Sequence, residues 1–387
     1  MVHIWDCGAG RLRELGSVTA ESSGHDKAVD RGAAQKTPAV AWHPHEPQLM
    51  VAGEGRVVRW SPAGPVDLKG PPPTASYRSL AFSPDGRTLW ATPSSGDEDS
   101  AWESSDVLNP LSGTVSSGPR WDTGMVEHPG GGLVATLRSD QGATYVLFAR
   151  VDHESVPGAA PRVLRRALIL DVDGYETPVF SADGRHLAVR GNAYDNSLEV
   201  FAFPSLRRVL ATPLGEPSPG YPYPQEWLDR MRAWSRQNIA FGTRPGVLWV
   251  GTPTGTLIEV GLDTEAAVVH DALTGSPVSG LGTTAAGDLV VAGAGGELAL
   301  LSVRGDSEKT RRADSQTSRA AVTAFLNGTS EVPEILDGDD LENHLVVTDG
   351  TRTWESDDLA TVATATAADP TWLRLRAAVN NARDQGN

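Results

Sequence analysis

Clusters of carboxylates are the first residues in this chain of 387 that could do chemistry. Residues 171–176 (DVDGYE) and 337–340 (DGDD) are rich in the oxygen ligands that calcium prefers. A calcium loop, however, needs alternating ligands followed by a distant bidentate glutamate, and neither segment has that spacing. Ordinary Asp-Gly turns explain both segments, so we expect no metal ion and no cofactor.

Histidine and cysteine do not form a catalytic or metal-binding pattern either. His43 and His45 flank Pro44, but a zinc site needs further ligands, and Cys7 is the only cysteine. The sequence also lacks the Gly-x-Ser-x-Gly, Walker and His-Glu-x-x-His motifs. We therefore expect no catalytic residues and a protein that is not an enzyme.

Aromatic residues gather in a long interruption at residues 214–236. Tyr221 and Tyr223 stand between prolines in its first half, and Trp227 and Trp234 lie in a second half with helical spacing. Such side chains dominate binding hot spots, so we take all four as candidate partner-binding residues. Packing of the two tryptophans against neighbouring elements is the alternative, and one aromatic could be buried while another is presented.

A repeated segment identifies the scaffold that must position these residues. The segment SLAFSPDGRTLWA from Ser79 returns in altered form at several points of the chain. The altered copies are PAVAWHPHEPQLMVA from Pro38, GMVEHPGGGLVAT from Gly124, TPVFSADGRHLAV from Thr177, NIAFGTRPGVLWV from Asn238, VSGLGTTAAGDLVVA from Val278 and AAVTAF from Ala320. Each full copy joins two apolar strands through a Pro, Gly or Asp turn, at a period of about 40–45 residues.

Further strands complete each unit. Third strands include RVVRWS from Arg56, SLEVFAF from Ser197 and TRTWESD from Thr351, and shorter fourth strands follow several of them. Four strands at this period are typical of a propeller blade. The sequence thus predicts an all-β fold, a β-propeller of seven four-stranded blades with one helical insertion and a short C-terminal helix.

The chain resembles the WD-repeat β-propeller family in degenerate form. Trp5-Asp6, Trp60-Ser61, Trp102-Glu103 and Trp354-Glu355 stand where that family has its Trp-Asp dipeptide, and Gly24-His25 stands where its Gly-His precedes the first strand. The resemblance covers roughly residues 1–365, although three central repeats lack the tryptophan. It implies a scaffold that binds proteins through its loops.

Closure of the ring involves both chain ends. Residues 2–6 read as a third strand and residues 11–15 as a fourth, and the family habit is for such strands to complete the last blade. Residues 320–364 are nevertheless expected to supply strands of a blade of their own, with TRTWESD as its third. The N-terminal strands would then be partly redundant.

Charge and hydropathy exclude several classes of partner. A net charge of −16 argues against nucleic acid, whose phosphates require a basic surface. No apolar run approaches the length of a bilayer-spanning helix, and the first residues lack the pattern of a secretory signal. We expect no membrane association and a cytoplasmic location.

These observations predict a propeller domain at residues 1–365, with a helical insertion at about 214–236, and a helical tail at 366–387. The expected function is a monomeric, non-catalytic scaffold that binds a protein partner on the face carrying the insertion. Two alternatives remain: a propeller enzyme or ligand sensor with its site at the central channel, and the separated propeller part of a larger signalling protein.

Overall fold

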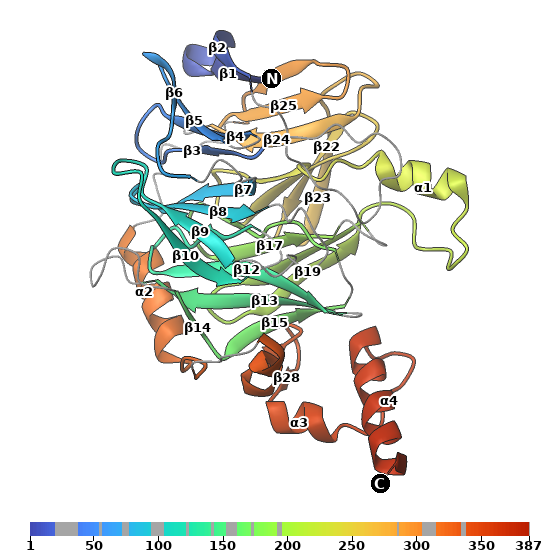
Figure 1. Ribbon diagram of the computed structural model, residues 1–387. Coiled ribbons are helices and arrows are strands. Elements are labelled where there is room, and N and C mark those ends of the chain that lie inside the picture. Colours follow the sequence, from blue (N-terminus) through green and yellow to red (C-terminus); the bar gives the residue numbers. More distant parts are fainter. Residues whose placement is uncertain are drawn as a thin grey trace.

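Short antiparallel strands dominate the computed structural model of the protein, drawn in Figure 1. It describes residues 1–19, 38–53, 56–71, 77–93, 104–120, 124–140, 143–151, 161–171, 174–191, 196–284, 286–303, 315–333 and 338–386. Within these residues five sheets have four strands or more, one has three and one has two. In the four-stranded sheets, strands that follow one another in sequence are hydrogen-bonded neighbours.

The first and second sheets follow the predicted repeat. Their strands are β3 (Val40–Trp42), β4 (Leu49–Gly53), β5 (Arg56–Ser61), β6 (Gly64–Asp67), β7 (Tyr77–Phe82), β8 (Leu89–Pro93), β9 (Ser104–Leu108) and β10 (Val115–Arg120). One apolar cluster joins Met50 and Val57 of the first sheet to Leu80 and Leu89 of the second. The core therefore lies between the sheets, as face-to-face packing of blades requires.

The third and fourth sheets share a larger core. Their strands are β11 (Val126–Glu127), β12 (Leu133–Asp140), β13 (Ala143–Arg150), β14 (Arg162–Val163), β15 (Arg166–Leu170), β16 (Val179–Phe180), β17 (His186–Arg190), β18 (Ser197–Ala202) and β19 (Arg207–Pro213). Leu133, Val146 and Phe148 of the third sheet pack with Leu187 and Phe201 of the fourth, and all five are fully buried.

The remaining strands complete the described part of the ring. They are β20 (Ile239–Phe241), β21 (Val247–Gly251), β22 (Thr256–Gly261) and β23 (Ala266–Asp271) in the fifth sheet, β24 (Val278–Thr283), β25 (Leu289–Gly293) and β26 (Leu298–Leu301) in the sixth, and the N-terminal hairpin β1 (Val2–Asp6) and β2 (Arg13–Val18). A 3₁₀ turn, Gly8–Gly10, joins the two hairpin strands. Ile4 and Val18 pack this hairpin on Leu49 and Trp60 of the first sheet.

First strands of neighbouring sheets contact one another, as β3 does with β7, β7 with β11 and β20 with β24. This arrangement is a propeller-like ring, so the predicted propeller architecture is confirmed. Seven complete four-stranded blades are not, because the sixth sheet has three described strands and the N-terminal hairpin two. The count of seven stays a prediction.

The repeated Ser-x-Asp-Gly turn has the same hydrogen bonds in the second and fourth sheets. The Ser83 hydroxyl donates to the Asp85 carboxylate at 2.6 Å, and the Arg87 N–H donates to the same oxygen at 3.0 Å. Ser181 and Asp183 reproduce this arrangement at 2.6 Å. Local turn chemistry therefore fixes the pairing of the first two strands in both repeats.

His43 and His128 occupy the position of the serine in the first and third sheets. The Nδ1 atom of His128 accepts the Gly130 N–H at 3.0 Å, and its Nε2 atom donates to the Gly184 carbonyl at 2.9 Å. A Cβ atom at Gly184 would overlap this imidazole. His43 packs in the same way on Phe82 of the second sheet, with ring centroids 5.0 Å apart. Each histidine thus connects its sheet to the next, and the reading of residues 43–45 as a turn is correct.

The expectation that residues 320–364 form a separate blade is wrong. The AAVTAF segment lies in helix α2 (Ser315–Asn327), and Phe325 inserts between the third and fourth sheets. The centroid of its ring is 5.0 Å from that of Phe148 and 5.1 Å from that of Phe203. Val322 and Phe325, at helical spacing, are both buried, and Gly328 follows the last helical residue. A short apolar run does not distinguish helix from strand, and here burial of one helical face decides.

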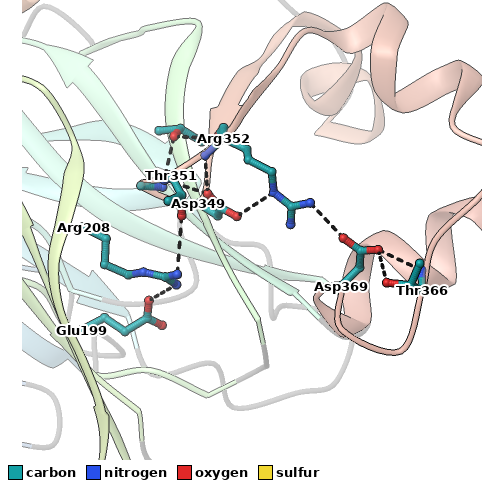
Figure 2. Close-up of polar contacts among 9 residues, drawn as sticks. Glu199, Arg208, Asp349, Thr351, Arg352, Thr366 and Asp369 are labelled. Carbon is teal, nitrogen blue, oxygen red and sulfur yellow. Dashed lines mark hydrogen bonds and ion pairs between the residues drawn. The ribbon is translucent and has the colours of Figure 1, made fainter.

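The following residues extend the third sheet. Strand β27 (Val346–Thr348) pairs in parallel with β15, and β28 (Thr353–Trp354) returns beside it. The turn at Asp349 and Gly350 lies on the edge of the fourth sheet, where the Arg208 N–H donates to the Gly350 carbonyl at 2.9 Å. Figure 2 shows this contact region together with the Glu199–Arg208 ion pair, whose closest atoms are 3.6 Å apart.

Helical elements make up the rest of the C-terminal part. They are a 3₁₀ helix, Gly338–His344, and the helices α3 (Ser356–Thr361) and α4 (Thr371–Gly386). Trp372 and Leu373 of α4 are buried in the apolar cluster that includes Tyr145 and Ile169 of the third sheet, whereas Leu375 and Val379 are 48% and 47% exposed. The predicted C-terminal helix is therefore present, and its first turn docks it on the ring.

Candidate partner-binding surface

The predicted helical insertion follows the last strand of the fourth sheet and precedes the first strand of the fifth. Helix α1 (Gln225–Arg232) lies in its second half and projects from the ring on the right of Figure 1, while α2 lies on the left. Contacts agree with these positions, because Asn196 at one end of the fourth sheet bonds to α1 and Asp183 at the other end bonds to α2. Pro224 is the residue before the helix, as its fixed φ favours.

Three of the four candidate aromatics form a row. Tyr221 meets Tyr223 edge-on with centroids 6.0 Å apart, and Tyr223 stacks on Trp227 at 5.2 Å. Trp227 is 4% exposed, and its indole N–H donates to the Pro217 carbonyl at 3.2 Å. Tyr221 is 89% exposed. The row therefore runs from a buried anchor to an aromatic ring in solvent.

Trp234 does not join this row. It lies after α1, half-buried against the apolar cluster between the fourth and fifth sheets, and its indole nitrogen approaches Gly215. The two tryptophans pack inward, as the packing alternative expected, and Tyr221 is exposed; partner binding by these residues stays a prediction. Of the four candidates, Tyr221 alone is offered fully to solvent.

Arg190, at the end of β17, ties the insertion to the ring. Its side chain is 1% exposed and donates to Asn238 Oδ1 at 3.0 Å, Asn196 Oδ1 at 2.8 Å and the Ser235 carbonyl at 3.3 Å. Asn196 in turn donates to the Met231 carbonyl at 2.9 Å. Burial lowers the pKa of Arg190 to about 10, so the group is still charged at neutral pH and its hydrogen bonds are charge-assisted.

The charges on the insertion are balanced. Arg230 pairs with Glu216 at 2.8 Å across the loop, and Arg232 lies 3.5 Å from Asp229 within the helix. These pairs are exposed and add little to stability. They leave the surface without a large field of one sign, so aromatic contact is what this surface can offer a partner.

The sequence identified the aromatic residues of this row but not the role of Arg190, nor the attachment of the β27–β28 hairpin to β15 and the fourth sheet. The available signal for Arg190 was a single arginine ending the apolar strand HLAVR, where a buried charge demands partners. The attachment had no local signal.

Several of the residues singled out in the sequence are not among those that the structure describes. They are Trp102, Gly24-His25 and parts of residues 171–176 and 337–340. Across the described ranges, no group of three or more His, Cys, Asp or Glu side chains could hold a metal ion. In the same part of the chain, no helix is both long and apolar enough to cross a membrane.

Comparisons with known proteins address the fold. No protein-family model matches the sequence, and no curated protein matches it. Among solved structures, hydrazine synthase of Kuenenia stuttgartiensis is similar, with a TM-score of 0.50 and 14% identity over 71% of this chain and 86% of that chain. Sqt1 of Saccharomyces cerevisiae has a TM-score of 0.45 and 12% identity over 71% of this chain and 72% of that chain. The first similarity supports a propeller arrangement, and at such low identity it says nothing of function.

Proposed function

We propose that the protein is a non-catalytic WD-repeat propeller that binds a protein partner on the face carrying residues 214–236. The observation that carries the proposal is the 89% exposure of Tyr221 at the end of an aromatic row anchored by buried Trp227. A tyrosine side chain has only two χ angles, so ordering its large ring on binding costs little conformational entropy, and tyrosine and tryptophan are accordingly enriched in hot spots.

The rigidity of the support is a second argument. Arg190 and Asn196 bond to the C-terminal end of the helical half of the insertion, at the Ser235 and Met231 carbonyls, and Arg236 pairs with Glu176 at 3.5 Å. A surface fixed in this way presents one shape to a partner rather than an ensemble, which lowers the entropic cost of association.

The finer description of the ring belongs to the same proposal. The N-terminal hairpin packs through Ile4 and Val18 on the first sheet, which consists of β3 to β6. We take it as the outer half of a seventh blade in a WD-repeat ring. Trp60, in the third strand of the first sheet, is 4% exposed, as a structural dipeptide tryptophan of that family would be. The proposal includes a cytoplasmic location and no binding of nucleic acid.

The test is affinity capture from native lysate followed by measurement of the dissociation constant with the purified partner. Replacing Tyr221 by alanine should weaken binding by about 2 kcal/mol, or about 30-fold, as loss of a hot-spot residue does. Because Tyr221 is exposed, the free energy of unfolding should change by less than about 0.5 kcal/mol.

Leu111→Ala is the matched control, since Leu111 is 85% exposed and lies in the turn between β9 and β10 of another sheet. Its substitution should leave the dissociation constant unchanged. A partner that binds Tyr221→Ala and wild type equally would exclude this surface. Failure of the wild type to retain any protein, with a metabolite or metal co-purifying, would favour the enzyme or sensor alternative.

A further inference from the structure

A polar cleft of about 550 Å³ lies where the C-terminal segment attaches to the third sheet. Its walls are strand β15, the β27–β28 hairpin and the chain that leaves α2. The parallel register aligns Arg166 with Val346, and the antiparallel register aligns Thr348 with Thr353, so these side chains share one face of the sheet. The volume is within the range of small-molecule sites.

Arg166 is the unusual residue of this cleft. Its guanidinium lies over the Phe325 ring, 5.2 Å from the centroid, and donates a hydrogen bond to the Ser205 carbonyl. Partial burial lowers the pKa of this guanidinium, and no charged group offsets that effect. Within the described residues no carboxylate pairs with Arg166, in contrast to its neighbour Arg165, which lies 3.6 Å from Glu355.

A half-buried guanidinium without a counter-charge is costly, since its charge has lost water without gaining an ion partner. The carbonyl end of α2 lies at the same cleft and supplies at most about half an elementary charge. The Arg165–Glu355 pair is neutral as a unit. The cleft thus keeps a net positive charge in a chain whose total is −16.

The cleft also offers hydrogen-bonding groups beside Arg166. Thr353 is exposed, and Asn327 and Ser330, in the chain that leaves α2, also line the cleft and can donate through an amide and a hydroxyl group. A planar guanidinium with adjacent hydroxyl and amide donors matches the oxygens of a phosphate or carboxylate. The walls are too polar to favour an apolar ligand.

We propose that this cleft binds a small organic anion, with Arg166 as the residue that contacts its phosphate or carboxylate group. The bound anion would supply the missing counter-charge. It would touch α2, the third sheet and the β27–β28 hairpin at once, and so would stabilise the attachment of the C-terminal segment.

Isothermal titration of the full-length protein with inorganic phosphate and, separately, with succinate tests the proposal at constant ionic strength set by chloride. We expect saturable binding of at least one probe, and the probe that binds identifies phosphate or carboxylate as the recognised group. Arg166→Gln should weaken binding by at least about tenfold. Arg87→Gln, which removes an exposed guanidinium in the second sheet, should change it by less than about twofold.

A second variant keeps the test decisive if Arg166→Gln disturbs folding. Thr353→Glu places a carboxylate on the rim, where it repels an anion and competes for Arg166, and the exposed position tolerates the change. It should also weaken binding by at least about tenfold. The proposal is overturned if neither probe binds saturably into the millimolar range, or if the folded variants bind as the wild type does.

Discussion

Replacing Gly350 by alanine should detach the β27–β28 hairpin from the fourth sheet. Gly350 has a φ of +86°, and a Cβ atom there would lie 2.6 Å from Arg208 Cβ, 2.7 Å from Arg208 N and 2.9 Å from Phe201 Cε1. Two of these atoms belong to a strand and the third to a buried ring, so none can move away freely. The hydrogen bond from the Arg208 N–H to the Gly350 carbonyl would be lost with the contact.

Two effects set the magnitude. A left-handed backbone conformation costs an alanine about 1–2 kcal/mol. Inserting a methyl group into a filled space adds about 1–3 kcal/mol. Gly350→Ala should therefore lower the free energy of unfolding by about 2–5 kcal/mol. Gly275 has a φ of +74° with no atom within 4 Å of a built Cβ, so Gly275→Ala isolates the backbone cost of about 1–2 kcal/mol.

Urea unfolding of both variants measures the two losses, and hydrogen exchange shows where the protein opens. We expect the larger loss in Gly350→Ala, with faster exchange at the Val346 amide, which donates to the Arg165 carbonyl at 2.7 Å. Equal losses in the two variants, with unchanged exchange at Val346, would refute the docking of the hairpin on the fourth sheet.

Three further predictions concern the core and the insertion. Burial lowers the pKa of His128 and of His186, so on acidification the unfolded chain binds protons before the folded one does. Urea unfolding should therefore show the free energy of unfolding falling as the pH drops from about 6.5, the pKa of a free histidine, toward the lower pKa values of the folded state. The fall should be shallower in His128→Gln. Arg190→Met leaves the Asn196 and Asn238 Oδ1 atoms and the Ser235 carbonyl without their donor. At about 1–3 kcal/mol for each buried acceptor left unsatisfied, it should cost about 3 kcal/mol or more and speed proteolytic cleavage of residues 214–236. Trp227→Ala should also expose the insertion to protease and lower the free energy of unfolding by about 3–5 kcal/mol, because Trp227 is buried. Tyr221→Ala, at an exposed position, should leave the cleavage rate unchanged.

The strands of the ring could be predicted because their turns are defined by local chemistry. The bonds of Ser83 to Asp85 and of Ser181 to Asp183 involve residues two positions apart, and the sequence alone contains all of that information. The same holds for α1, where helical spacing of apolar residues and Pro224 identified the element. Exposure of the individual aromatics could not be predicted in this way, because Trp227 is buried by Tyr223 and by the Pro217 carbonyl within a folded loop.

The C-terminal segment was misassigned in two ways: residues 320–325 form part of a helix, and the strands at residues 346–354 have the predicted local pattern but a different partner. Residues 346–354 do form a strand, a turn and a strand, as the repeat predicts. Their partner is β15, about 180 residues earlier in the chain, and the pairing is parallel. A parallel partner is joined only through a long connection, so no short-range signal specifies which sheet edge will be covered.

Coverage of that edge gives the attachment a physical reason. Without β27, the backbone N–H and C=O groups on the side of β15 that faces away from β13 would have no strand partner. Exposed strand edges of this kind promote association between chains. The C-terminal segment attaches there through two contacts: β27 bonds to β15, and Phe325 of α2 fills the space between two sheets. Within the segment, Arg352 lies 3.5 Å from Asp349 and 2.8 Å from Asp369 and so joins the turn of the hairpin to the residues before α4 (Figure 2). The pKa of Asp369 is lowered to about 2 by the Thr366 N–H and by Arg352, so this last contact persists well into acid. Loss of the docked hairpin should therefore reveal itself first as association between chains, since the turn at Gly350 and the strand pair it positions are what separate β15 from solvent.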